Sequence, residues 1–282
     1  MRRKTVPGSK RRPGAPPLLA DPPRTDEFAL RAYGVRIGIR TDDPYVLDRI
    51  RAYLPPGWKP VESSRVERLY VVRRGASSST YILYADARQM LQTESLEQLL
   101  SNLALDLHFY IAERARDHLF IHAGVVGWGG RAIVIPGRSS SGKTTLVRAL
   151  LHCGATYYSD EYAVFDRHGC VHPFPTPLFF RREGEEGEPM LIETLGSSVG
   201  TVPLPVGLIV FTAYDPTCQW RPRRLSPGEA LLDLLSHTIS ARRHPAFALA
   251  VLSRVASRAI ALKGKRGEAE PTAQEILSRA VL

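Results

Sequence analysis

The sequence contains few cysteines and no long apolar run, and each shortage excludes a class of protein. Three cysteines, Cys153, Cys170 and Cys218, are scattered through 282 residues without a C-x-x-C spacing. An odd number of isolated thiols predicts neither a disulfide framework nor a zinc site, and it suits a reducing cytoplasm. No stretch approaches the roughly 20 apolar residues that a transmembrane helix needs, and the N-terminus lacks the apolar segment of a signal peptide. We therefore expect a cytoplasmic protein that does not associate with membranes.

Acidic residues are almost missing from residues 1–25, which are also rich in proline and glycine. This tail holds seven lysines and arginines against one aspartate, so it carries +6 of the net charge of +10. A basic tail is compatible with binding to anionic lipid or nucleic acid. Its composition is more typical of a disordered, solvated arm, and we expect no specific nucleic-acid partner. The chain as a whole, with 44% hydrophobic and 23% charged residues, is ordinary globular material.

Residues 26–115 have the pattern of a small α+β module. The predicted elements are a strand over 35–40, a helix after the N-cap Asp43, paired strands over 69–72 and 81–84, and a helix after the N-cap Ser95. No convincing catalytic cluster occurs among them. Substrate docking or assembly, and a purely structural cover for the next domain, are equally compatible with this pattern.

The most informative motif is a glycine- and serine-rich loop between a predicted strand and a predicted helix. It matches G-x-x-x-x-G-K-[ST], the phosphate-binding pattern, with Gly137, Arg138, Ser139, Ser140, Ser141, Gly142, Lys143 and Thr144, followed by Thr145. In such a loop, backbone N–H groups and the helix N-terminus bind phosphate, Lys143 reaches the β- and γ-phosphates, and the Thr144 hydroxyl faces Mg²⁺. The sequence therefore predicts binding of a nucleotide such as ATP; the alternative is a Gly/Ser-rich surface loop.

A second predicted strand, over 118–126, precedes the loop's own strand. A glycine-rich turn at 127–130 separates the two, which predicts an antiparallel hairpin. Such a hairpin is unusual for a P-loop NTPase, whose sheet is mainly parallel. His122 lies on this strand, either as a packed core residue or, with Lys143, as part of the lining of a γ-phosphate pocket.

Two adjacent carboxylates, Asp160 and Glu161, follow a short predicted strand soon after the loop helix. Transfer of a phosphoryl group to a hydroxyl needs a carboxylate near the acceptor, Mg²⁺ ligands and charge compensation. Adjacent residues of a strand face opposite sides, so both reach the site only if the strand ends there. We expect Asp160 to take the acceptor's proton and Glu161 to bind the metal or its waters. The alternative is a surface turn, or a metal-binding pair without kinase activity.

These motifs, in this order, resemble the catalytic domain of HPr kinase/phosphorylase and the HPr-kinase-like proteins. The matching segments are the strand around His122, the following turn and strand over 131–137, the phosphate loop, and Ser159-Asp160-Glu161. The resemblance covers roughly residues 118–262. It implies an α/β fold of the type shared with phosphoenolpyruvate carboxykinase, in which a mixed sheet carries the P-loop. We therefore expect a kinase domain over residues 116–282.

The resemblance also implies an activity, the Mg-ATP-dependent phosphorylation of a serine hydroxyl. In that activity Lys143 would bind phosphate, Thr144 would bind magnesium, Asp160 would be the base, and His122 would lie near the γ-phosphate. Similar proteins often accompany operons for ribosomally made, modified peptides, and some phosphorylate the C-terminal serine of lasso peptide precursors. The expected acceptor is therefore a peptide or small protein.

Two features depart from the family pattern. Glu161 stands where the family usually has aspartate, which lengthens the side chain by a methylene. The family's later Glu-x-Arg-Gly segment, which carries a metal-binding glutamate and contacts HPr, is not recognisable. Candidate replacements for that glutamate are Glu183, Glu185, Glu186, Glu188 and Glu193. The missing segment argues against HPr itself as the substrate.

The rest of the chain continues as an α/β pattern and leaves several questions open. The remaining predicted elements are an acidic mobile loop over 183–189, a strand over 208–211, a helix after the N-cap Ser226, and helices over 245–261 and 272–282. A nucleotide-binding regulatory or assembly protein with little catalysis, and a small-metabolite kinase of the same fold, are the alternative functions. The acceptor, the preference between ATP and GTP, and the oligomeric state, for which a homo-oligomer is one option, are not determined by the sequence.

Overall fold

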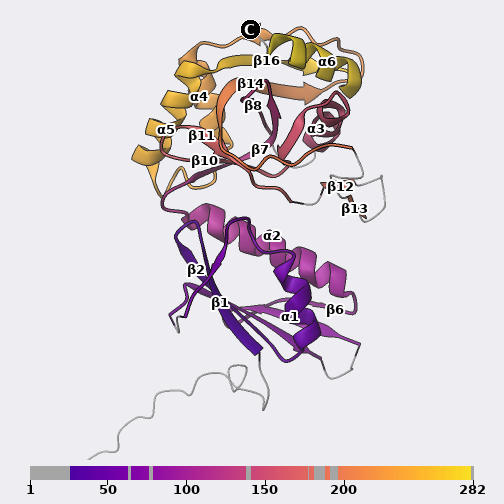
Figure 1. Ribbon diagram of the computed structural model, residues 1–282, viewed down its shortest axis with the longest axis vertical. Helices are drawn as coiled ribbons and strands as arrows, with labels where there is room; N and C mark the ends of the chain where they lie inside the picture. Colours follow the sequence, from indigo (N-terminus) through magenta and orange to yellow (C-terminus); the bar gives the residue numbers. More distant parts are fainter. Residues whose placement is uncertain are drawn as a thin grey trace, which may run out of the picture.

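A computed structural model describes most of the chain and shows a mixed α/β protein. The described residues are 26–62, 65–75, 79–137, 141–176, 178–180, 188–190 and 196–280. Within them the chain forms two mixed sheets, a small two-stranded sheet and six helices, with the first sheet below the second in Figure 1. The expected α/β class is confirmed at this level. The tail 1–25 and the loop residues 138–140 lie outside the described residues.

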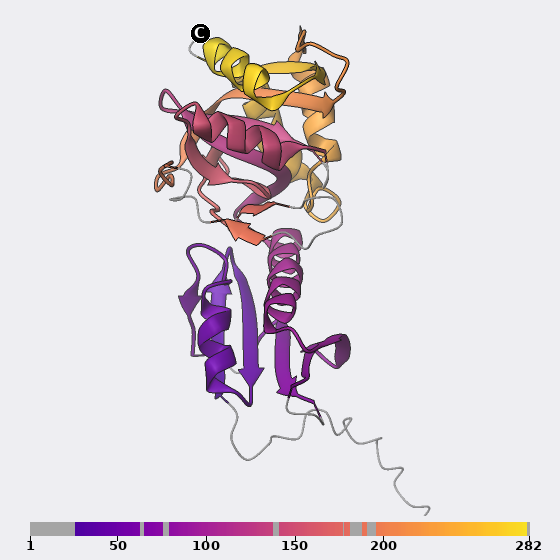
Figure 2. The ribbon, with the colours of Figure 1, turned by 90° about the vertical axis from the view of Figure 1, so that its right-hand side faces the viewer.

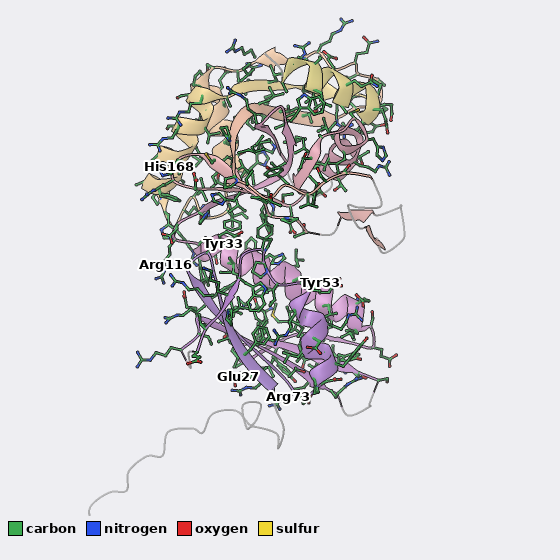
Figure 3. The ribbon with its side chains drawn as sticks, viewed as in Figure 1. Glu27, Tyr33, Tyr53, Arg73, Arg116 and His168 are labelled. Atoms are coloured by element: carbon green, nitrogen blue, oxygen red, sulfur yellow. The ribbon has the colours of Figure 1, made fainter. Side chains whose placement is uncertain are left out.

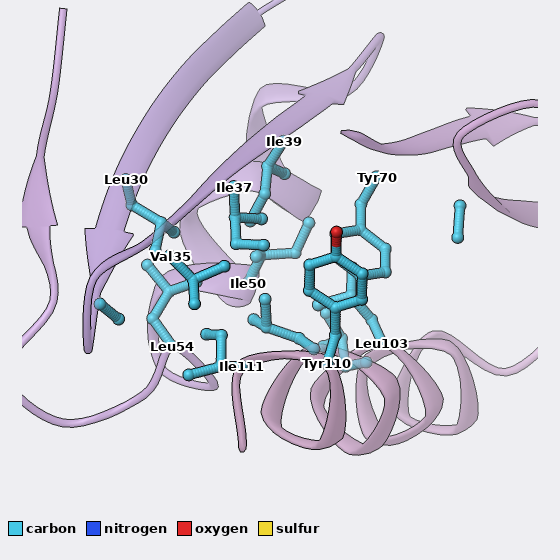
Figure 4. Close-up of a cluster of buried hydrophobic side chains, with 14 of the residues drawn as sticks. Leu30, Val35, Ile37, Ile39, Ile50, Leu54, Tyr70, Leu103, Tyr110 and Ile111 are labelled. Atoms are coloured by element: carbon cyan, nitrogen blue, oxygen red, sulfur yellow. The ribbon is translucent and has the colours of Figure 1, made fainter. Parts of the chain in front are cut away.

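The first sheet has six strands among the described residues, in the order β3-β1-β2-β4-β5-β6. Its strands are β1 (Asp26–Ala32), β2 (Val35–Thr41), β3 (Lys59–Pro60), β4 (Arg68–Arg74), β5 (Tyr81–Ala85) and β6 (Arg88–Thr93). β2 and β4 are parallel, and the other neighbouring pairs are antiparallel. Helices α1 (Pro44–Arg51) and α2 (Leu96–Arg114) pack on this sheet and bury a common core, part of which Figure 4 shows.

Local side-chain chemistry sets the ends of these elements. The Asp43 carboxylate accepts hydrogen bonds from two backbone N–H groups of the first turn of α1, and the Ser95 hydroxyl accepts one from Gln98 at the start of α2. Both N-caps were predicted, and both are confirmed. The β1–β2 hairpin turns at Tyr33 and Gly34, with φ of 49° and 84°. Two positive φ values match the twist that a two-residue hairpin loop needs.

The second sheet has eight strands among the described residues. Seven of them run in the order β11-β10-β7-β8-β14-β16-β15, and β9 pairs with β7. Its strands are β7 (Leu119–Trp128), β8 (Arg131–Pro136), β9 (Thr156–Ser159), β10 (Tyr162–Phe165), β11 (Cys170–His172), β14 (Leu204–Tyr214), β15 (Arg223–Arg224) and β16 (Ile260–Arg266). β11 also pairs with the start of β14, so five strands close into a ring. The predicted antiparallel hairpin is confirmed as β7 and β8.

Helices cover both faces of the second sheet. They are α3 (Lys143–His152), α4 (Pro227–Ser236), α5 (Pro245–Arg258) and α6 (Ala269–Arg279). α3 and α6 share one buried core with the sheet and lie side by side in Figure 2, whereas α4 and α5 share another. The two helix pairs therefore sandwich a sheet whose parallel strands β8 and β14 are largely buried, whereas the third parallel strand, β16, is buried only in part.

The two sheets share apolar packing where they meet. The core of the first sheet continues into Phe120 of β7, Tyr162 of β10 and Phe174, all fully buried. The ring of Tyr33, from the β1–β2 turn, lies 5.0 Å from the ring of Phe120 in an edge-to-face contact, and Figure 3 shows Tyr33 between the sheets. Phe174 lies within 6.2 Å of the same tyrosine ring. Residues of the first sheet and of the second sheet therefore stabilise one continuous core.

Some predicted elements were wrong. The helix predicted over 245–261 ends at Arg258, and the residues from Ile260 onward form β16, because parallel pairing with β14 replaces the helical hydrogen bonds. The helix predicted over 272–282 begins earlier, at Ala269. β1 and β6 were not anticipated.

The acidic segment predicted as a loop over 183–189 falls partly outside the described residues. Its last two residues belong to β13 (Glu188–Met190), which pairs with β12 (Leu178–Phe180). That part of the loop prediction was therefore wrong.

The shared core predicts the effect of a truncation at the junction. Phe120→Ala should lower the free energy of unfolding by about 3–5 kcal/mol, because it leaves a cavity that the surrounding aromatic rings cannot move to fill. Urea denaturation followed by circular dichroism measures this. Phe109→Ala on α2, where the ring is 46% exposed, is the matched control and should cost far less. A similar loss for both variants would contradict the idea that the junction is a packed core.

Candidate functional site

The loop of interest lies between the end of β8 and the start of α3. Gly137 directly follows β8, and its N–H donates to the carbonyl of His122 on the neighbouring strand, 3.1 Å away. A Cβ on Gly137 would lie 2.6 Å from the Ser141 hydroxyl, so any side chain there would displace the loop. Gly142, the N-cap of α3, has φ of 80°, which favours glycine. Gly137 therefore leaves room for the Ser141 side chain, and Gly142 adopts a backbone conformation that other residues rarely adopt.

The other predicted residues of the loop are placed as far as the structure describes them. Lys143 and Thr144 open α3, and both are partly buried. Thr145 follows them in the first turn and is exposed. Arg138, Ser139 and Ser140 lie outside the described residues. The described part is thus a strand, a glycine-containing loop and a helix N-terminus, in that order.

The two carboxylates lie in the short connection between β9 and β10. β9 ends at Ser159, so Asp160 and Glu161 are not constrained to opposite faces of a strand. The buried Ser159 hydroxyl accepts hydrogen bonds from the N–H groups of Glu161 (3.2 Å) and Tyr162 (3.0 Å). This local hydrogen bonding fixes the turn and holds both carboxylates at one edge of the sheet.

A direct hydrogen bond joins this turn to the start of α3. The Thr144 hydroxyl donates to Oδ2 of Asp160 over 2.6 Å. The other oxygen, Oδ1, is buried and has no hydrogen-bond partner among the described residues. It lies 3.7 Å from where a Cβ on Gly124 would be, and that Cβ would also lie only 2.6 Å from Val147 of α3. Gly124 therefore lets the helix approach β7, and the carboxylate lies beside it at ordinary contact distance.

The charges at this edge influence one another. Burial raises the pKa of Asp160 to about 6, although the Thr144 hydrogen bond and the Lys143 cation oppose the change. Burial also raises the pKa of Glu161, against a hydrogen bond from Tyr162 and the Lys143 cation. The pKa of Lys143 is lowered by its own burial, while both carboxylates act to raise it. One cation and two carboxylates are thus within electrostatic reach, and Asp160 titrates near neutral pH.

His122 lies beside this group. It pairs with Tyr162 across β7 and β10, and the two rings are 5.1 Å apart at an angle of 32°. Burial lowers the pKa of His122, and the Lys143 cation lowers it further, against a hydrogen bond to the backbone of Glu161. The imidazole is therefore neutral at pH 7. His122, Lys143, Asp160 and Glu161, predicted from separate segments, are brought together.

Two residues near the loop were not anticipated. Arg266, at the end of β16, is 2% exposed and donates from Nη2 to the carbonyl of Gly142 over 2.9 Å. Tyr214, at the end of β14, lies over its guanidinium, with 5.3 Å between the ring centre and Cζ. No alternation of apolar residues marks β16 in the sequence, and the contact of Arg266 with the loop depends on parallel pairing with β14.

The arrangement suits a hydrated divalent cation and phosphate oxygens. Hydroxyl and carboxylate oxygens, as on Thr144 and Glu161, are the ligands that Mg²⁺ prefers. No group of three or more His, Cys, Asp or Glu side chains able to hold a metal occurs in the described part of the chain. Of the candidate metal-binding glutamates, Glu183, Glu185, Glu186 and Glu193 lie outside the described residues, and the side chain of Glu188 is not described either. A metal held here would therefore need ligands from phosphate and water as well.

The chain was compared with protein-family models and with curated proteins. The chain matches no protein-family model. It also matches no curated protein. Among the described residues, no helix has both the length and the apolar character needed to cross a bilayer.

The raised pKa of Asp160 predicts a pH-dependent gain in stability for Asp160→Asn. The folded-state pKa lies above the unfolded one, so the penalty for ionising Asp160 is absent below about pH 4 and complete above about pH 6. The variant should raise the free energy of unfolding by about 1–3 kcal/mol at pH 8 and by little at pH 4. Urea denaturation at both pH values measures this.

Asp48→Asn, at a side chain that is 82% exposed, is the control and should change stability at neither pH. Destabilisation by Asp160→Asn at pH 8 would show that the carboxylate is a net stabilising charge and would contradict the burial argument.

Proposed function

We propose that this chain is a Mg-ATP-dependent kinase of the HPr-kinase-like type, which transfers the γ-phosphate to a serine hydroxyl of a peptide or small protein. The observation that carries the proposal is the 2.6 Å hydrogen bond between Thr144 and Asp160. It joins a helix N-terminus suited to phosphate with a carboxylate whose pKa is close to the working pH of a general base. The order of motifs along the chain supports the family assignment.

The hydrogen bond also supports a division of roles between the two carboxylates. A hydroxyl that donates its proton to Asp160 presents its lone pairs elsewhere, so Thr144 is oriented to bind a cation. Oδ1 of Asp160 is buried and has no hydrogen-bond partner among the described residues, so a hydroxyl that reached it would meet an unused acceptor. Glu161, on the same turn, then serves the metal or its waters, and Lys143 compensates the charge of the phosphates. Bound magnesium would supply charge neutralisation between the β- and γ-phosphates.

Neutral His122 fits the proposal as a hydrogen-bonding group rather than a charge. The imidazole lies close enough to Lys143 for the cation to lower its pKa, so it belongs to the same cluster of side chains. Its ring is held against Tyr162 and by the backbone of Glu161. In that position it can orient a phosphate oxygen or the acceptor hydroxyl without competing with Asp160 for the proton.

Two variants separate nucleotide binding from transfer. Lys143→Ala should abolish binding of Mg-ATP, because the loop loses its phosphate cation. Asp160→Asn should leave binding nearly intact and lower transfer by about a hundredfold or more, because the base is lost. Calorimetry with Mg-ATP measures the first, and label transfer from [γ-³²P]ATP to peptides encoded beside the gene measures the second. Transfer by the wild type no greater than by Asp160→Asn would refute the kinase.

The division of roles predicts different metal dependence for the two carboxylates. Glu161→Gln should raise the Mg²⁺ concentration for half-maximal transfer by about tenfold or more, as is usual when a group that supports a metal is lost. Asp160→Asn should leave that concentration within about threefold while lowering the maximal rate. A raised Mg²⁺ requirement for Asp160→Asn, together with a lowered maximal rate for Glu161→Gln, would instead indicate that Asp160 supports the metal and Glu161 is the base.

The alternative is a nucleotide-binding regulatory protein with little catalysis, which the same hydrogen bond favours in one respect. A hydroxyl and carboxylate pair beside a phosphate loop is sufficient to hold a metal–nucleotide complex. Mg-ATP binding that depends on Lys143, without transfer to any acceptor, would support this function over the kinase. Transfer to a small metabolite instead of a peptide would support a kinase of different substrate class.

A further inference from the structure

The topology indicates on which side of the loop a nucleoside would lie. β8, β14 and β16 are parallel, so their carboxyl ends meet at one edge, and the loop leaves that edge from β8. Asp160 and His122 lie on the β7 side of β8. A triphosphate whose outermost phosphate faces Asp160 must extend its other end away from β7. That direction leads to the carboxyl ends of β14 and β16, the edge of a parallel sheet at which ligands bind.

A half-exposed aromatic ring lies at that place. Tyr214 is the last residue of β14, and its side chain is 50% exposed. Its Cβ lies 3.9 Å from where a Cβ on Gly142 would be, so Tyr214 is next to the end of the loop. The phenol donates to Oε1 of Glu268 over 3.0 Å, which limits rotation of the ring. A flat apolar surface is therefore held beside the start of α3.

Arg266 connects this ring to the loop. It is opposite Tyr214 in the β14–β16 register, and its guanidinium donates to the carbonyls of Gly142 and Gly267, each over 2.9 Å. Its Nε is buried and has no partner among the described residues. A buried cation that bonds to the N-cap residue of α3 and lies beneath the Tyr214 ring fixes the distance between the ring and the loop.

We propose that Tyr214 is the surface on which the base of the nucleoside triphosphate stacks, and that Arg266 positions it relative to the phosphate loop. The proposal rests on the proposed function, since it requires a nucleotide at the loop. Stacking on one aromatic face needs only a π system, so it accepts adenine and guanine alike. Tyr214 thus contributes to affinity for nucleoside triphosphates and little to discrimination between ATP and GTP.

The experiment compares a ligand that has a base with one that lacks it. Calorimetry measures Mg-ATP, Mg-GTP and magnesium tripolyphosphate binding to the full chain and to Tyr214→Ala. The variant should lose about tenfold or more in affinity for both nucleotides, because a base–aromatic stack is lost, and less than about twofold for tripolyphosphate. Tyr214→Phe keeps the ring and should retain nucleotide affinity within about threefold. Tyr45→Ala, at an exposed tyrosine of α1, is the control and should change nothing.

The outcomes separate this inference from the proposed function. Equal losses for nucleotides and tripolyphosphate would mean that Tyr214 acts only through the loop, and would overturn the stacking site. Unchanged affinity of Tyr214→Ala for ATP would overturn it as well, while Lys143-dependent binding of ATP left the proposed function intact. A wild type that binds neither ATP nor tripolyphosphate would refute both.

Discussion

The hydrogen bond between Thr144 and Asp160 joins two segments that each have a separate structural reason to be where they are. α3 begins at the loop after β8, and the carboxylate turn follows β9. α3 packs closely against β7 because Gly124 has no side chain to clash with Val147, and Asp160 lies beside the same glycine. The contact buries a carboxylate next to a lysine, and the burial is what moves the pKa of Asp160 toward neutrality. The packing that removes water from Asp160 is therefore also the cause of its raised pKa.

β7 organises both the site and its support. Alternate residues of a strand share a face, and on one face of β7 these residues are Phe120, His122, Gly124 and Val126. Phe120 belongs to the core shared with the first sheet, and Val126 to the core beneath α3. His122 and Gly124, between them, line the candidate site. β7 therefore packs at one end against the junction of the two sheets and at the other end against α3, and the candidate site lies between these two contacts.

Sequence patterns predicted what depends on neighbours in the chain. The N-caps Asp43 and Ser95, the β7–β8 hairpin and the helix after the loop each follow from a few consecutive residues, and the structure has all of them. The position of Asp160 beyond the end of β9 was also foreseeable, because the apolar run stops at Tyr158. The hydrogen bond between Asp160 and Thr144 was not predicted, since spacing alone does not bring residue 144 to residue 160.

Features that depend on pairing between distant segments could not be predicted in this way. The helical spacing of apolar residues in α5 runs directly into β16, and only the neighbouring strand β14 decides where the helix stops. Arg266 reaches the Gly142 carbonyl across 124 residues of sequence. The core shared by the two sheets could not be predicted either, because no local sequence pattern indicates that the rings of Tyr33 and Phe174 lie near each other.

That shared core has a mechanical consequence for any acceptor. Two sheets connected by a short linker alone would tumble against each other, and a peptide held by one would sample many distances from the other. Here Tyr33, Phe120 and Phe174 interlock, so the surface of the first sheet keeps a fixed orientation toward the carboxylates. The distance from any point on the first sheet to Asp160 is therefore constant, which would set how far a peptide bound to that sheet must extend to reach the carboxylate.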